Sequence, residues 1–128
     1  AETSQEDRRR AAKVPAEGRI PVLGWPVAFD PEGLTLRLLR SIDFPVGALV
    51  LVAMGSAPHL PRLVEEARLL RPDLRVVRVA ENLGCAGGWN EVIHAAPEAP
   101  WWLVSSHDVA YPPGVLARVA AQTEAALA

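Results

Sequence analysis

Hydrophobic positions along the chain follow two alternating patterns, short continuous apolar runs and longer segments with helical spacing. The apolar runs predict four strands, at about Arg19 to Trp25, Ala48 to Ala53, Leu74 to Val79 and Trp101 to Ser105. The longest run, Val46 to Met54, is too short to span a bilayer and is better explained as a buried strand. In the fourth strand we expect the two tryptophans to lie on opposite faces, both within the core.

Segments with apolar residues three or four positions apart follow each apolar run. They predict helices near Gly33 to Ile42, from His59 to Leu70, from about Gly88 to Ala96, and from Pro113-Gly114 to the end. The inner face expected for the last helix is Leu116, Val119, Ala120, Thr123 and Leu127. This alternation is typical of a parallel sheet covered by helices. We therefore predict a three-layer α/β/α domain with a mainly parallel sheet and right-handed crossovers.

The length, composition and net charge of the chain limit the number of domains and the classes of partner that we expect. A chain of 128 residues, half of them apolar, is long enough for one compact domain and too short for two ordinary ones. We expect a flexible charged tail over residues 1–17 and a folded domain over residues 18–128. The net charge of −2 provides no basic field of the kind that binds nucleic acid. No membrane segment is visible in this chain, so we expect a soluble domain.

Cys85 is the single cysteine of the chain, which excludes an internal disulfide. This slightly favours the cytoplasmic side or another reducing compartment. The cysteine falls within a glycine-rich segment, where we expect its small side chain to be packed.

That segment, Glu81 to Asn90, reads Glu-Asn-Leu-Gly-Cys-Ala-Gly-Gly-Trp-Asn and joins the third strand to its helix. Glycines allow close approach of the backbone to a ligand, and the free amides of a helix amino end favour a phosphate or another anion. The spacing differs from GxGxxG, so a dinucleotide cofactor is not the first choice. A purely structural turn is the alternative interpretation.

The exits of all four strands are candidate sites, because ligands of open parallel sheets bind beyond the carboxyl ends of the strands. These exits are Pro26 to Asp30, Met54 to Ala57, Asn82 to Gly88 and Ser106 to Asp108.

Together the exits resemble the donor-binding half of glycosyltransferase family 2, whose members are nucleotide-sugar enzymes of the GT-A type. The resemblance covers about Ile20 to Val119. It is carried by the series Asn82-x-Gly84-x-Ala86-Gly87-Gly88-x-Asn90 and by a strand ending in Ser106-His107-Asp108, followed by Pro113-Gly114. The resemblance implies a GT-A, Rossmann-like sheet of strand order 3-2-1-4. It also implies that the chain is a fragment of a larger glycosyltransferase.

The resemblance implies an activity for this site. It is the transfer of a sugar from a nucleotide-diphosphate donor to the hydroxyl of a carbohydrate or glycoconjugate acceptor. The family's metal-binding DxD motif falls on Ser106-His107-Asp108, which implies Asp108 as a ligand of Mn²⁺ or Mg²⁺. The residues implied in nucleotide-sugar binding are Pro26, Gly55, Ser56, Asn82, Gly84, Gly87, Gly88, Asn90, His107 and Asp108. In family members, the C-terminal half of the protein supplies the catalytic base, and this sequence has no counterpart of that half. We therefore assign no catalytic residue and leave enzymatic activity open.

Departures from the family pattern keep other interpretations open. The second strand ends in Ala53-Met54 where family members hold the base with a carboxylate, and Phe29 stands at the position of a turn asparagine. These changes favour a non-catalytic binding or regulatory module on the same fold. An unrelated doubly wound domain of flavodoxin-like or Rossmann-like type is a further alternative. In a purely structural interpretation, Asp108 is a turn residue and Gly55-Ser56 simply ends a strand.

Overall fold

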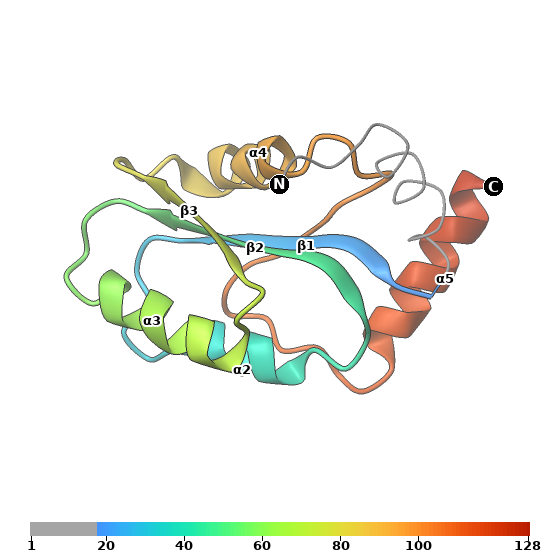
Figure 1. The fold of residues 1–128 in the computed structure, drawn as a ribbon, viewed down its shortest axis with the longest axis horizontal. Helices are drawn as coiled ribbons and strands as arrows, with labels where there is room; N and C mark the ends of the chain where they lie inside the picture. Colours follow the sequence, from blue (N-terminus) through green and yellow to red (C-terminus); the bar gives the residue numbers. More distant parts are fainter. Residues whose placement is uncertain (1–17) are drawn as a thin grey trace.

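A computed structural model describes residues 18 to 128, so the tail predicted over residues 1–17 lies outside the described part of the chain. The described strands are β1 (Ile20–Val27), β2 (Val46–Met54), β3 (Arg75–Val79) and β4 (Leu103–Val104). They alternate with helices α2 (Leu34–Ser41), α3 (Leu60–Leu70), α4 (Gly84–Ala95) and α5 (Val115–Leu127), as Figure 1 shows. The alternation predicted from the hydrophobic pattern is confirmed.

The four strands form one sheet in the order β3-β2-β1-β4. Each neighbouring pair is parallel. The register pairs Ile20 with Val46 and Val27 with Ala53 along the two central strands. Every residue of β1 is buried, as expected for a strand that has neighbours on both sides and helices on both faces. Both the α/β class and the expected strand order are therefore confirmed.

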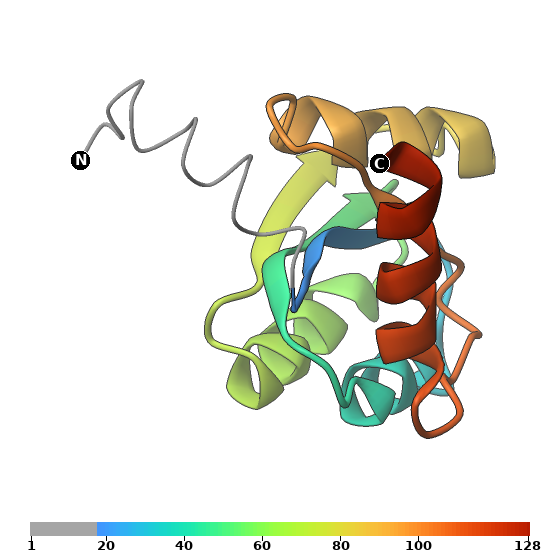
Figure 2. The same ribbon diagram turned by 90° about the vertical axis from the view of Figure 1, so that its right-hand side faces the viewer.

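Helices cover both faces of this sheet and create two separate cores. Helix α4 lies on one face, while α2 and α3 lie on the other (Figures 1 and 2). Helix α5 contributes Leu116 and Ala120 to the larger core. The larger core includes Trp25, Leu38 and Leu63 on the α2 and α3 side. The smaller core, under α4, is formed by Val22, Val50, Val52, Met54 and Val92. Trp101 joins the larger core and Trp102 packs against the smaller one, which confirms that the two indoles lie on opposite faces.

Helix α4 approaches the sheet closely because two glycines remove side chains from the contact. A Cβ atom added at Gly24 in β1 would lie 2.4 Å from Cγ1 of Val92. A Cβ atom added at Gly88 in α4 would lie 2.3 Å from Cβ of Pro26. Real Cβ atoms do not approach that closely, so glycine is required on both sides of the contact. The amino end of α4 is thereby fixed at the carboxyl edge of the sheet.

The main differences from the sequence prediction concern the start of α4, the length of β4 and the burial of Leu127. Helix α4 begins at Gly84 rather than Gly88, so the glycine-rich segment is part of the helix despite the poor helix propensity of glycine. Strand β4 covers only Leu103 and Val104, which are in register with Leu23 and Gly24 of β1. In α5, the expected inner-face residue Leu127 is 62% exposed, because no residue after Ala120 in this helix joins the core.

Candidate functional site

Two of the predicted site residues meet where β1 and β2 end. Pro26 is buried in β1 and contacts the backbone of Gly88 in α4. The sulfur of Met54 lies 3.4 Å from the position that a Cβ of Gly88 would take, so the end of β2 closes the same contact. These residues hold the helix against the strand exits. Their predicted contact with a nucleotide sugar stays a prediction.

The next two predicted residues follow β2 directly. Gly55 has a φ of +86°, a conformation that favours glycine, and its amide donates to the carbonyl of Val79 at 2.8 Å. This bond continues the pairing of β2 with β3 for one more residue. Ser56 is exposed immediately beyond it. A solvent-facing hydroxyl is therefore available at the exit of β2.

The glycine-rich segment forms the first turns of α4, which corrects the expectation of a loop. Asn82 is exposed, and its Oδ1 accepts a hydrogen bond from the Gly84 amide at 3.0 Å, where Gly84 has a φ of +73°. A Cβ added at Gly87 would lie 2.5 Å from Cβ of Leu83, so Gly87 is also a packing residue. The first amides of a helix have no partner within the helix. Those of Cys85 and Ala86 are therefore the amides best placed to meet an anion.

Two further residues of this helix, Cys85 and Asn90, are exposed to solvent. Cys85 is exposed, so the expectation that its side chain is packed is wrong. The cause is the early start of α4, which places residue 85 in the first turn, on the outside. Asn90 is exposed on the same helix. Its predicted role in donor binding stays a prediction.

The acidic motif that follows β4 is anchored at its start by β1 and α4. The Ser105 amide donates to the carbonyl of Gly24 at 2.9 Å. The indole Nε1 of Trp89 donates to the carbonyl of Ser105 at 3.0 Å. A turn then follows, in which the Val109 amide donates to the carbonyl of Ser106 at 3.2 Å. Helix α4 and the acidic motif, which are separate in the sequence, are thus joined directly.

Helix α2 holds the rest of this segment. Nη2 of Arg37 donates to the backbone carbonyl of Asp108 at 2.6 Å. The Tyr111 amide donates to Oγ of Ser41 at 2.9 Å. The carboxylate of Asp108 is exposed and takes part in none of the hydrogen bonds found among residues 18–128. It is therefore free to bind a cation or a ligand hydroxyl.

A buried carboxylate at the exit of β1 was missed by the sequence analysis. Asp30 is 3% exposed, and its two oxygens accept the amides of Leu34 and Thr35 at the start of α2, each at 2.8 Å. Burial raises the pKa of Asp30, but these amide hydrogen bonds and the charge of His107 oppose it, so the pKa is lowered overall. An aspartate a few residues before a predicted helix is the signal that could have identified this cap.

His59 connects the start of α3 to the same exit. The Asp30 amide donates to Nε2 of His59 at 2.8 Å, so this nitrogen is an unprotonated acceptor and the ring hydrogen is assigned to Nδ1. The ring of His59 meets that of Phe29 edge to face, with centroids 5.2 Å apart. Phe29 is 67% exposed. The β1 exit therefore presents an aromatic ring to solvent above a fixed backbone.

The residues of the acidic motif fit a divalent cation only in part. Asp108 provides one uncommitted carboxylate, and His107 beside it is partly exposed. Within residues 18–128, no group of three or more histidine, cysteine, aspartate or glutamate residues is arranged to hold a metal ion. Mg²⁺ is commonly bound by one or two carboxylates together with substrate phosphates and waters. A single-carboxylate site is compatible with that mode of binding.

None of the helices in the described part of the chain combines the length and the apolar character needed to cross a membrane. No protein-family model matches the sequence, and no curated protein shows significant similarity to it.

Among solved structures, the chain is similar to a mannosyltransferase from Pyrobaculum calidifontis in complex with GDP-Man and Mn²⁺. The TM-score is 0.60 and the sequence identity is 20%, over 82% of this chain. The match covers 34% of the mannosyltransferase, so this chain spans about a third of its length. At this identity the likeness establishes the fold, which is GT-A-like.

Proposed function

We propose that this chain is the donor-binding part of a glycosyltransferase and takes a nucleotide-diphosphate sugar at the carboxyl ends of its strands. The observation that carries the proposal is the direct join between Trp89 in α4 and Ser105 at the start of the acidic motif. This bond brings free helix amides and an acidic segment to one edge of the sheet. The GT-A-like fold supports the same placement, although a fold alone does not determine function.

In this proposal the amino end of α4 receives the diphosphate. The amides of Cys85 and Ala86 carry the partial positive charge of the helix end. Gly84 keeps the approach to them open, because nothing lies within 4 Å of the Cβ position at this residue. In this proposal, two exposed polar side chains contact the nucleotide sugar: Asn82, just before the helix, and Ser56, just after β2. Asn90 and His107 extend the same set.

Asp108 would hold a Mn²⁺ or Mg²⁺ ion through its exposed carboxylate, with His107 beside it. The ion would neutralise charge that develops on the departing diphosphate. The acceptor is a carbohydrate or glycoconjugate hydroxyl, and no residue between 18 and 128 is assigned as its base. Transfer therefore requires a group that this part of the chain does not provide.

A non-catalytic binding module on the same fold is the second candidate. Ala53 and Met54 occupy the end of β2, and each is only 3% exposed. Neither side chain can accept a hydrogen bond from a nucleobase as a carboxylate does. This observation favours a protein in which the base is recognised differently, or in which donor chemistry has been lost.

Replacing Asp108 by asparagine is expected to weaken metal-dependent donor binding about tenfold or more, which corresponds to about 1.4 kcal/mol. The asparagine keeps the backbone carbonyl that Arg37 binds, so only the carboxylate charge is removed. The measurement is a thermal-shift and calorimetric titration with GDP-mannose, GDP, UDP-glucose and UDP, with and without Mn²⁺. A ligand at one hundred times its dissociation constant should stabilise the wild type by about 2.7 kcal/mol.

Glu65→Gln is the matched control, since it removes an exposed carboxylate from α3 and should leave binding unchanged. Absence of any stabilisation of the wild type by these nucleotides would reject the donor-binding proposal. Nucleotide binding whose affinity is unchanged by Mn²⁺ and by the Asp108 substitution would support the non-catalytic module instead.

A further inference from the structure

The segment between β4 and α5 is tied at three points to α2 and the turn after it. Arg37 donates to the carbonyl of Asp108, Ser41 accepts the Tyr111 amide, and Asp43 accepts the Gly114 amide. The three hydrogen bonds follow one another in the same order along both partners, so the segment runs parallel to α2. The segment follows the helix instead of crossing open solvent.

Only the first of these ties reaches Asp108 itself. The hydrogen bond between Val109 and Ser106 closes a turn within the segment, and the ties at Tyr111 and Gly114 lie three and six residues further on. Among the described residues, the bond from Arg37 is thus the one hydrogen bond that reaches Asp108 from another element. Its length of 2.6 Å indicates a close, charge-assisted bond.

This bond is solvent-exposed, as is the Arg37 side chain. An exposed hydrogen bond of a long side chain contributes little to folding, because water offers both partners an alternative. Its main effect is to restrict where the Asp108 peptide can lie. Side chains that bind a metal ion depend on such supporting contacts, which hold them in the productive geometry.

We propose that Arg37 is the positioning residue of the candidate metal site and, through the backbone carbonyl of Asp108, fixes the peptide from which the Asp108 carboxylate extends. The inference rests on the proposed function, because it assigns Arg37 to the site where a divalent cation and a nucleoside diphosphate bind. It adds a residue on α2, an element that the sequence motifs do not include.

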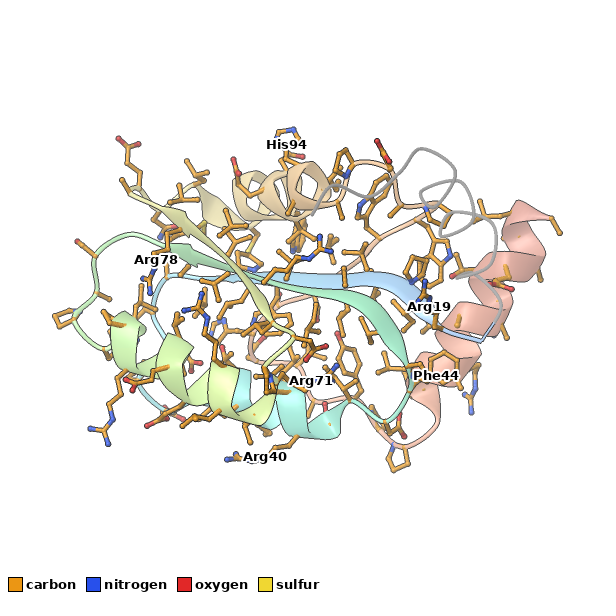
Figure 3. The ribbon with its side chains drawn as sticks, viewed as in Figure 1. Arg19, Arg40, Phe44, Arg71, Arg78 and His94 are labelled. Atoms are coloured by element: carbon orange, nitrogen blue, oxygen red, sulfur yellow. The ribbon has the colours of Figure 1, made fainter. Side chains whose placement is uncertain are left out.

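The test replaces Arg37 by methionine, which keeps an unbranched stem but has no donor, and by lysine, which keeps a charged donor group. Arg40 on the next turn of α2 is the matched control, because it is exposed and points away from the sheet (Figure 3). The Arg37→Met, Arg37→Lys and Arg40→Met proteins are titrated with GDP and UDP, with and without Mn²⁺. Hydrogen exchange of residues 106–111 is measured on each protein without ligand.

We expect Arg37→Met to bind the nucleotide about tenfold more weakly in the presence of Mn²⁺, with unchanged binding in its absence. Exchange in residues 106–111 should become faster, and the melting temperature should change little. Arg37→Lys should restore part of the affinity, and Arg40→Met should match the wild type in every measurement. A donor to the carbonyl, rather than general positive charge on α2, is then the property that matters.

Two results would overturn the inference. One is an Arg37→Met protein with wild-type exchange and wild-type affinity. The other is an equal loss of affinity with and without Mn²⁺, which would mean that Arg37 contacts the nucleotide directly. If the wild type binds neither nucleotide, the proposed function fails, and the exchange measurement alone decides whether Arg37 fixes the segment.

Discussion

Replacing Asp30 by alanine is expected to lower the free energy of unfolding by about 3 kcal/mol. The substitution leaves the amides of Leu34 and Thr35 without the acceptors that now lie 2.8 Å away. Hydrogen bonds to a charged group are among the stronger ones, and a buried donor without a partner bears the full cost of desolvation. The measurement is urea denaturation followed by circular dichroism.

Asp73→Ala is the control for this prediction. Asp73 is exposed and pairs with Arg71 at 2.8 Å, so its loss should cost only about 0 to 1 kcal/mol. Equal effects of the two substitutions would show that Asp30 is not a structural cap.

The same carboxylate makes stability depend on pH in a defined direction. Because the pKa of Asp30 is lowered from 3.8 in the folded protein, its contribution is fully present above pH 3.8 and is lost as the pH falls further. Asp30→Asn cannot titrate at this position. The difference in stability between wild type and Asp30→Asn should therefore be constant at neutral pH and shrink below pH 3.8. A difference that stays constant down to about pH 2.5 would contradict the lowered pKa.

The second large effect is expected at the contact between α4 and β1. Gly88→Ala should destabilise the protein by about 1 to 3 kcal/mol, because the new methyl group would overlap the rigid ring of Pro26, 2.3 Å from its Cβ. At an open helix position, the same change would stabilise by about 1 kcal/mol. The sign of the effect therefore reports how closely the helix packs, and thermal and urea denaturation both measure it.

Asn90→Ala, at an exposed position of the same helix, should stabilise slightly and serves as the control. If Gly88→Ala increased stability as well, α4 would lie further from the sheet than the contact with Pro26 requires.

The sequence was sufficient for those features that depend on local pattern. Continuous apolar runs such as Val46 to Met54 could be assigned to strands, since a strand covered on both faces has no polar side. The strand order followed from the resemblance carried by the glycine and acidic motifs, and not from the hydrophobic pattern. The donor-binding roles of those motifs stay predictions.

Features that depend on contacts between distant residues were missed. The close contact of α4 with Pro26 is made by Gly88, which lies 62 positions further along the chain, and the helix begins earlier than predicted, at Gly84. The bond between Asp30 and His59 joins residues 29 positions apart, and nothing in either local sequence marks it. The bond from Arg37 to Asp108 spans 71 positions and ends on a backbone atom, which leaves no pattern in the side chains.

The two partners that meet at Ser105 differ in how they can respond to a bound molecule. Helix α4 packs closely on β1 at Gly24 and Gly88. A movement of the helix toward the strand would bring their atoms into steric overlap. The stretch from Ser106 to Gly114 packs against the larger core through Tyr111, and its other contacts with α2 and the turn after it are individual hydrogen bonds that can be exchanged one at a time. The structure should therefore adapt to a ligand of different shape in that stretch. Substitutions in residues 106–114 are the ones best chosen for laboratory evolution of altered ligand selectivity.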